Sequence, residues 1–150
     1  MPKDDSIARD QIARSVRQFS ALCFRTVAGK AQVLLVTPRG SGRWILPKGN
    51  PMDGCSPAET ARQEAWEEAG VSGKVFDRSL GSFDYIKDPG EADIPCRIDV
   101  YPLKVKKLLD RFPEKGQRRR KWFSLREAAA KVEEAELQKI LRSFDPKSID

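Results

Sequence analysis

The sequence predicts an α+β sandwich, and three observations support that fold class. Short segments rich in β-branched and aromatic residues alternate with turns along most of the chain. One segment in the middle has the alanine spacing and the capping residues of a helix. A second segment near the C-terminal end is alanine-rich and periodic in the same way. Strands would therefore surround one helix, and another helix would close the chain.

The first half of the chain is predicted to hold three strands. Residues 16–25 (VRQFSALCFR) and 32–37 (QVLLVT) suit strands, and the turn Ala28-Gly29-Lys30 would join them as a hairpin. Residues 43–47 (RWILP) are predicted to form a short strand that ends at Pro47-Lys48-Gly49. Residues 1–15 are polar and charged, so an N-terminal arm, helical or flexible, is expected before a single domain over 16–150.

The central helix has clear start and stop signals. Ser56, Pro57 and, three residues after the serine, Glu59 form a capping box with proline at the first helical position. Gly70 can adopt the left-handed conformation that ends a helix. A stripe of small residues would let the helix lie close against a sheet; its members are Ala58, Ala61, Ala65 and Ala69.

The second half is predicted to add strands and the closing helix. Residues 74–86 indicate one or two strands, and 96–104 a further strand after the charged loop 87–93. Residues 114–121 (EKGQRRRK) are strongly basic and precede Trp122-Phe123, which we expect to pack the closing helix, 125–141, onto the sheet.

Composition excludes several classes of function. The chain has 150 residues, no histidine and three cysteines without a CxxC pair, which argues against Ser-His-Asp catalysis, a disulfide framework and a structural zinc site. No apolar run is long enough to span a membrane and the N-terminus lacks a signal-peptide core, so a cytoplasmic location without membrane contact is predicted.

The acidic residues of the central helix lie where negative charge is electrostatically unfavourable. Glu64, Glu67 and Glu68 share one face near the C-terminal end, where negative charge opposes the helix dipole by about 0.3–1 kcal/mol per residue. Lysine and arginine are absent from the helical positions three and four residues away. A solvated acidic face is the simpler explanation, but a bound divalent cation would remove the repulsion. Oxygen ligands without histidine or cysteine suit Mg²⁺ or Mn²⁺.

The net charge of +6 indicates that the surface outside this acidic site attracts negatively charged molecules. A basic protein with an acidic metal site suggests a polyanionic substrate that the positive electrostatic field attracts and the metal ion bridges to the protein. Nucleic acid is possible on charge alone but is not favoured.

The central segment resembles the Nudix hydrolase motif, Gly-x5-Glu-x7-Arg-Glu-apolar-x-Glu-Glu-x-Gly-apolar. Gly49 begins the match, and six later positions fall in register: Glu64, Ala65, Glu67, Glu68, Gly70 and Val71. RWILPKG before the motif and KWFSL after it also look like this family. The resemblance implies an α/β/α sandwich with a mixed sheet, in which the central helix carries the motif. Cys55 and Gln63 depart from it, standing where the family has Glu and Arg.

The resemblance implies metal-dependent hydrolysis of a phosphoanhydride. Glu64, Glu67 and Glu68 would be the catalytic carboxylates and, with the backbone carbonyl of Lys48 or Gly49, would hold Mg²⁺ or Mn²⁺. The similarity makes Glu64 the expected general base. The loop acids Glu91 and Asp93 are the alternatives.

Within the family, the sequence is most similar to diphosphoinositol polyphosphate phosphohydrolases and diadenosine polyphosphate hydrolases. ALCFR, EEAGV and RRRKWF carry this similarity. It implies that five basic residues contact phosphate: Arg17, Arg39, Lys48, Arg97 and Arg118. The match is weakest in the first strand, where Arg17 only lies close to a basic position of such enzymes and Gln18 replaces another. Arginine suits phosphate because its planar fork donates two hydrogen bonds.

Two other functions stay open at this point. The RRRK segment could contact RNA in an enzyme that removes pyrophosphate from RNA 5′ ends. Alternatively, Cys55 and Gln63 could mark a non-catalytic protein that binds a phosphorylated metabolite. Trp44 and Trp122 could stack on a base if the substrate were a nucleotide, although packing is the commoner role of such residues.

Overall fold

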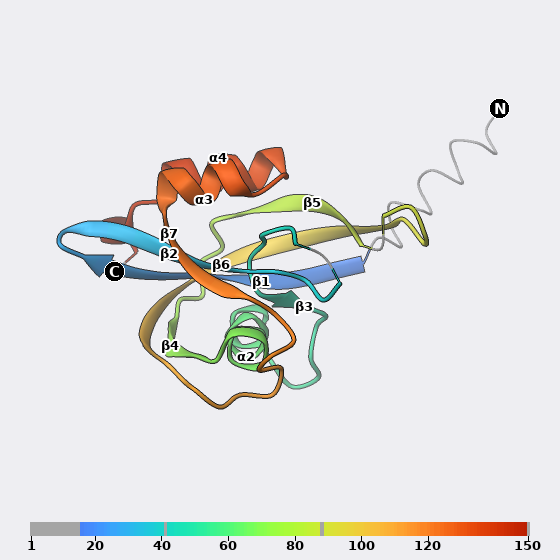
Figure 1. The fold of residues 1–150 in the computed structure, drawn as a ribbon, viewed down its shortest axis with the longest axis horizontal. Coiled ribbons are helices and arrows are strands. Elements are labelled where there is room, and N and C mark those ends of the chain that lie inside the picture. Colours follow the sequence, from blue (N-terminus) through green and yellow to red (C-terminus); the bar gives the residue numbers. More distant parts are fainter. Residues whose placement is uncertain (1–15, 41, 88, 150) are drawn as a thin grey trace.

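A computed structural model describes residues 16–40, 42–87 and 89–149. The predicted arm, 1–15, lies outside them. Within them a mixed sheet separates helix α2 (Pro57–Ala69) from α3 (Leu125–Lys131) and α4 (Ala135–Ser143), which cover the opposite face (Figure 1). These three layers confirm the predicted α+β class. No helix among the described residues is both long and apolar enough to cross a membrane.

The sheet has seven strands, and its main path runs β4-β6-β1-β2-β7. Only the β1–β6 pair is parallel among the strand pairs of the described residues. Two strands lie off this path, since β3 pairs with β1 and β5 with β6. The strands are β1 (Val16–Val27), β2 (Lys30–Val36), β3 (Lys48–Gly49), β4 (Val71–Val75), β5 (Gly81–Lys87), β6 (Ile94–Leu108) and β7 (Arg120–Ser124).

Strand β1 pairs with two different strands, β3 and β2, along one of its edges. Its early residues Phe19 and Ser20 pair with β3, whereas β2 joins it from Phe24 onward. The start of the Nudix-like motif is therefore tied by backbone hydrogen bonds to the beginning of β1. This pairing holds Lys48 and Gly49 beside α2, which packs on β1 and β3.

The predicted strand at residues 43–47 is wrong in position. Ile45 makes an isolated bridge with Val36, and the two-residue strand begins only at Lys48. Ile45 and Leu46 are nevertheless fully buried, because their side chains fill the core. These residues are apolar because they are buried, and not because they belong to a strand.

Helix α2 has the predicted ends. The Ser56 side chain accepts a hydrogen bond from the Glu59 N–H at 3.2 Å, which forms one half of the expected capping box. Gly70 ends the helix at φ 66°, and its N–H donates to the carbonyls of Ala65 and Trp66. The alanine stripe is buried at every position against the sheet.

The region after α2 divides into two strands, as the sequence allowed. β4 begins directly after the helix and β5 follows a five-residue loop, and both pair with the long strand β6. β6 extends beyond the predicted 96–104 at both ends. It is the central scaffold of the fold because β1, β4 and β5 all pair with it.

The prediction of one closing helix over 125–141 is wrong, because the chain breaks between α3 and α4. The break contains neither glycine nor proline, so no local signal announces it. Val132 is extended and 2% exposed, and Arg43 from a distant loop forms ion pairs with Glu133 and Glu134. Tertiary contacts therefore set this boundary. Phe123 packs in the core as predicted, and Trp122 packs against it partly buried.

Candidate active site

The three acids of α2 occupy different environments. The Glu68 side chain is 7% exposed and Glu64 is half-buried. The Glu64 carboxylate lies so close to Gly49 that a Cβ atom there would force the carboxylate to move. Glu64 Oε2 is buried without a hydrogen-bond partner among the described residues. Glu67 is also partly exposed, and its carbonyl accepts a hydrogen bond from the Glu114 N–H at 2.9 Å.

Burial makes two of these acids weak. It raises the pKa of Glu64 to about 7, with the charges of Glu67 and Glu114 adding to the effect. It raises the pKa of Glu68 to about 8, although the Arg118 guanidinium opposes the rise. Both carboxyl groups therefore retain protons near neutral pH in the metal-free protein. This reduces the charge repulsion that the sequence predicted for the end of α2.

Cations from the end of the chain supply the rest of the compensation. Arg120 Nη1 donates to the carbonyl oxygens of Ala69 at 2.6 Å and Leu109 at 3.1 Å, and so caps α2 with a positive charge. Arg118 Nη2 lies 3.9 Å from Glu68 Oε2 and 2.9 Å from Glu114 Oε1. Sequence reasoning missed the contacts of Arg120 with Ala69 and of Arg118 with Glu68, because each joins residues about 50 positions apart.

The acidic cluster fits a divalent cation in its chemistry. It offers several carboxylates, a buried oxygen of Glu64 without a partner, and the backbone of Gly49 in close approach. Within the described residues, no three acidic or cysteine side chains converge closely enough to hold a metal ion. The side chains of α2 would therefore have to turn toward a common point on binding.

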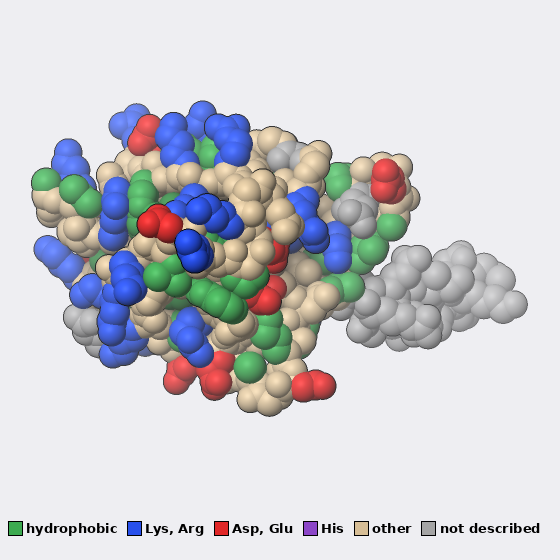
Figure 2. All heavy atoms as spheres, turned by 60° about the horizontal axis from the view of Figure 1, so that its bottom comes forward, with side chains coloured by type: hydrophobic (Ala, Val, Ile, Leu, Met, Phe, Trp, Pro, Cys, Tyr) green, Lys and Arg blue, Asp and Glu red, His purple; other side chains and the backbone are tan. Residues whose placement is uncertain are grey.

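A basic cleft of about 760 Å³ adjoins these acids. Lys48 and Arg118 link the two, since both line the cleft and both act on the charge of Glu68. Among the described residues, the lining includes five cations and two acids: Arg39, Arg43, Lys48, Lys87 and Arg118, with Glu91 and Glu133. Lys and Arg side chains also outnumber acidic ones on the face of the molecule that Figure 2 shows.

The cleft gathers three of the five predicted phosphate contacts, namely Arg39, Lys48 and Arg118. Arg17 and Arg97 are not part of its lining. Arg17 Nη2 lies 2.6 Å from Asp99 Oδ2, and Arg97 is ion-paired in the same way to an acid of β5; both arginine side chains are more than half exposed.

Strand geometry explains this separation. Arg17 and Arg97 lie opposite one another in the β1–β6 pair, so they share one face of the sheet. Side chains alternate along a strand, so Arg17 faces away from the side of Ser20, whose cross-strand partner is Lys48. A check of strand parity in the sequence could have found this difference.

The alternative bases also differ in position. Glu91 lines the cleft. Asp93 has φ 48° and its carboxylate accepts a hydrogen bond from the Gly90 N–H at 2.8 Å, so it stabilises a turn. Trp44 packs edge-to-face on Phe123 with 5.1 Å between ring centroids, which is a packing role.

Tyr85 and Arg43 are cleft residues that sequence reasoning missed. Lys48 Nζ and Arg43 Cζ each lie 4.4 Å from the centre of the Tyr85 ring. The alternation of Phe83 and Tyr85 on one face of β5 is a signal that could have placed Tyr85 inside.

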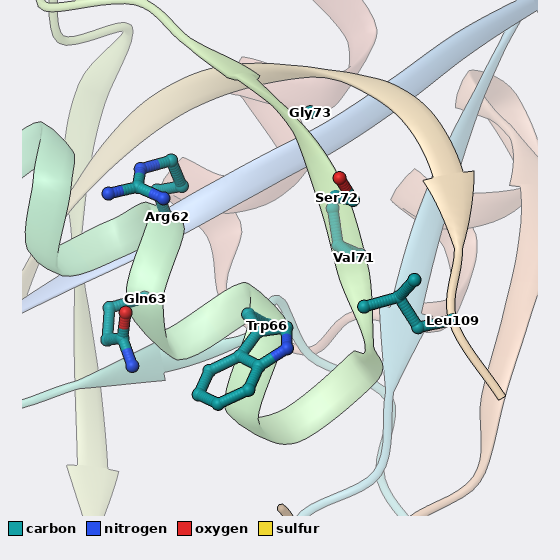
Figure 3. Close-up of a pocket in the computed structure, with 7 residues that line it drawn as sticks. All are labelled: Arg62, Gln63, Trp66, Val71, Ser72, Gly73 and Leu109. Atoms are coloured by element: carbon teal, nitrogen blue, oxygen red, sulfur yellow. The ribbon is translucent and has the colours of Figure 1, made fainter. Parts of the chain in front are cut away.

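The two departures from the motif lie outside the cleft lining. Cys55 is exposed. Gln63 lines a second hollow of about 380 Å³ between α2 and β4, together with Arg62 and the partly exposed Trp66 (Figure 3). No hydrogen bond of the Gln63 side chain is found within the described part of the chain. In this structure, therefore, no hydrogen bond links Gln63 to Glu64 among the described residues.

Comparison with known sequences confirms the resemblance. Residues 16–144 match the family model described as the NUDIX domain. The chain is 34% identical over 114 residues to diphosphoinositol polyphosphate phosphohydrolase 3-alpha of Homo sapiens, covering 75% of this chain and 66% of that protein. It is 29% identical over 121 residues to Nudix hydrolase 13, mitochondrial, of Arabidopsis thaliana, covering 77% and 60%. The chain thus spans slightly less than two thirds of the length of these relatives.

Solved structures show the same fold. A Caenorhabditis elegans (C. elegans) Ap4A hydrolase binary complex matches with a TM-score of 0.67 and 23% identity, covering 85% of this chain and 93% of that one. A NUDIX hydrolase from Nitrosomonas europaea matches with a TM-score of 0.66 and 20% identity, covering 86% and 87%. At these identities the comparison concerns the fold alone.

Proposed function

The chain belongs to the Nudix family, and from this premise we propose that it is a metal-dependent hydrolase of phosphoanhydride bonds in a small polyphosphorylated molecule. One observation carries the proposal: buried carboxylates at the end of α2 adjoin a cleft in which cations outnumber acids, with Lys48 and Arg118 shared between them. The names of similar proteins make diphosphoinositol and diadenosine polyphosphates the first substrates to test. We place the activity in the cytoplasm on the sequence prediction alone.

The carboxylates would hold the metal and activate water. Glu64, Glu67 and Glu68, with the carbonyl of Lys48 or Gly49, would bind Mg²⁺ or Mn²⁺. When bound, such an ion lowers the pKa of water and neutralises phosphate charge. Glu64 would accept the proton of the attacking water.

The cations of the cleft would bind the phosphate chain. Arg39 and Arg118 can each donate two hydrogen bonds to one phosphate, and Lys48 provides a compact charge. We leave Arg17 and Arg97 out of this set because each is already paired with a carboxylate outside the cleft lining.

The lining of the cleft favours an inositol-type polyphosphate over a nucleotide. Tyr85 is the one aromatic residue among the described residues that line it. Its side chain is 6% exposed and already carries two cations, so a nucleobase would find no free aromatic face there. RNA is disfavoured for a similar reason, since Arg119 lies over Trp44 and Arg120 caps α2.

A turnover assay tests the proposal. The panel contains a diphosphoinositol polyphosphate, diadenosine penta- and hexaphosphate, a nucleoside triphosphate and triphosphorylated RNA, each with Mg²⁺, Mn²⁺ or EDTA. We expect metal-dependent cleavage with the diphosphoinositol substrate preferred. Ligand binding without turnover of any member would instead identify a non-catalytic binder, the function that Cys55 and Gln63 suggested.

A further inference from the structure

Tyr85 joins the proposed phosphate-binding lysine to the rest of the fold. It lies in β5 and is 6% exposed, yet its ring forms part of the cleft wall. Lys48 Nζ lies 4.4 Å from the ring centroid, within the range in which an ammonium group is attracted to an aromatic face. This contact connects two elements that do not pair with each other, because β3 pairs with β1 and β5 pairs with β6.

Lys48 needs such a support. Its side chain has four flexible bonds, and ordering it costs rotamer entropy. No hydrogen bond or ion pair of Lys48 Nζ is found within the described residues, so the Tyr85 ring is the contact that orients it. Lys48 is also partly buried, so its ammonium group has fewer water molecules around it than a fully exposed lysine has. A phosphate oxygen would restore a partner.

Arg43 also contacts the Tyr85 ring and links it to the break between α3 and α4. Its guanidinium lies 4.4 Å from the ring centroid and 3.1 Å from Glu133 Oε2 and 3.4 Å from Glu134 Oε2. The two glutamates sit in the break between α3 and α4. The Glu134 side chain is only 8% exposed, so this end of the contact chain is anchored in the interior.

We propose that Tyr85 is a positioning residue that holds the Lys48 ammonium over the cleft, with Arg43 fastening the ring to the α3–α4 break. The inference rests on the proposed function in one respect only, namely that Lys48 contacts substrate phosphate. Tyr85 would therefore act on binding through Lys48 and would touch neither the metal nor the bond that is cleaved.

The experiment compares Tyr85→Leu, Tyr85→Phe, Lys48→Met and the double variant Tyr85→Leu/Lys48→Met. Tyr101→Leu is the matched control, because Tyr101 is 8% exposed and packs on Phe19 outside the cleft lining. Two quantities are measured without metal: the affinity for inorganic tripolyphosphate, and the proton chemical shift of the Lys48 Hε atoms. The aromatic ring current moves that shift upfield. KM and kcat on the preferred substrate of the panel follow.

We expect the Lys48 Hε shift to be upfield in the wild type and in Tyr85→Phe, and to be lost in Tyr85→Leu. Tyr85→Leu should weaken tripolyphosphate binding and raise KM about fivefold, with kcat changed by less than about twofold. Tyr85→Phe should restore most of the affinity, because the ring remains. Adding Tyr85→Leu to Lys48→Met should have no further effect on affinity.

Three results from the variants would overturn the proposal. These are an unchanged Lys48 shift in Tyr85→Leu, an equal loss of affinity from Tyr85→Leu with and without Lys48, and an equal loss in Tyr101→Leu. Absence of tripolyphosphate binding by the wild type would also overturn it. A wild type that binds tripolyphosphate through Lys48 and Tyr85 but hydrolyses nothing would contradict the proposed function while supporting the positioning role.

Discussion

Helices α2 and α3 begin alike and end differently. Each starts at a serine, Ser56 or Ser124, whose side chain accepts a hydrogen bond from the backbone of a glutamate three residues later. In α3 the glutamate also bonds back to the serine N–H, completing the capping box. Lys131 then provides a positive charge in the last turn, as the helix dipole favours.

The last turn of α2 has no basic residue, and acids stand there instead. The pKa values show the consequence. Hydrogen bonds from Ser124 hold the pKa of Glu127 below its ordinary value, whereas burial raises the pKa of Glu64 to about 7 and of Glu68 to about 8. A helix that only supports the fold satisfies its charges locally. Helix α2 depends on distant residues for compensation, which is typical of a site that keeps charge available for a ligand.

The largest expected difference between the two helices concerns turnover. Glu64→Gln and Glu68→Gln should each lower kcat/KM by at least about a hundredfold, because each removes a carboxylate proposed to bind metal or accept a proton. Glu127→Gln in α3 is the matched control and should leave kcat/KM within about twofold of wild type. Unchanged turnover in both α2 variants would refute the assignment of the site.

The next effect concerns the end of α2. Gly70→Ala should lower the free energy of unfolding by about 3 kcal/mol, because φ is 66° and the new Cβ would meet Phe112 and Arg120. Gly54→Ala, at φ 78° but with open space around it, should cost only about 1 kcal/mol. Urea unfolding curves measure both. Equal losses would mean that strain alone, and not the packing of Arg120 on the helix end, matters at Gly70.

A smaller effect is expected when the distant cap is removed. Arg120→Gln should lower the free energy of unfolding by about 2 kcal/mol, since two carbonyl groups lose a charged donor. Lys131→Gln removes the local cation of α3 and should cost about 0.5 kcal/mol. Thermal and urea unfolding of the two variants give the comparison. A larger loss for Lys131→Gln would contradict the view that α2 depends more on its cation.

A further difference between the two helices concerns the pH dependence of stability. Between pH 4.5 and about 8, folded Glu64 and Glu68 retain protons that the unfolded chain has released, because their folded pKa values are raised. Stability without metal should therefore be complete at the acidic end and fall as pH rises through this window, by about 3 °C or more in melting temperature.

The fall should be absent in Glu64→Gln/Glu68→Gln, and Mg²⁺ or Mn²⁺ should offset it in the wild type. Metal-free melting temperatures between pH 5 and 8.5, measured in one buffer system with EDTA, provide the test. A melting temperature that follows the same course in the double variant would assign the pH dependence to other groups.

Predictions from the sequence succeeded where the determining interactions are local. The ends of α2 depend on Ser56 and Gly70, whose effects reach only one turn, and the hairpin turn between β1 and β2 is equally local. The α3–α4 break was not predictable because contacts with Arg43, some 90 residues away in sequence, accompany it. The position of β3 was missed because burial of Ile45 resembles a strand pattern whether or not a strand forms.

By itself, the sequence determined the α+β class, the acidic helix and its family, since each rests on residue types at fixed spacing along one segment. Only the tertiary structure decided which cations meet the acids and which lie elsewhere. Arg118 and Arg120 reach α2 because β7 joins the sheet edge at β2, while Arg17 and Arg97 face away from Lys48 because side chains alternate along β1 and β6. Charge compensation acts through space, and the order of residues along the chain does not specify distances between strands.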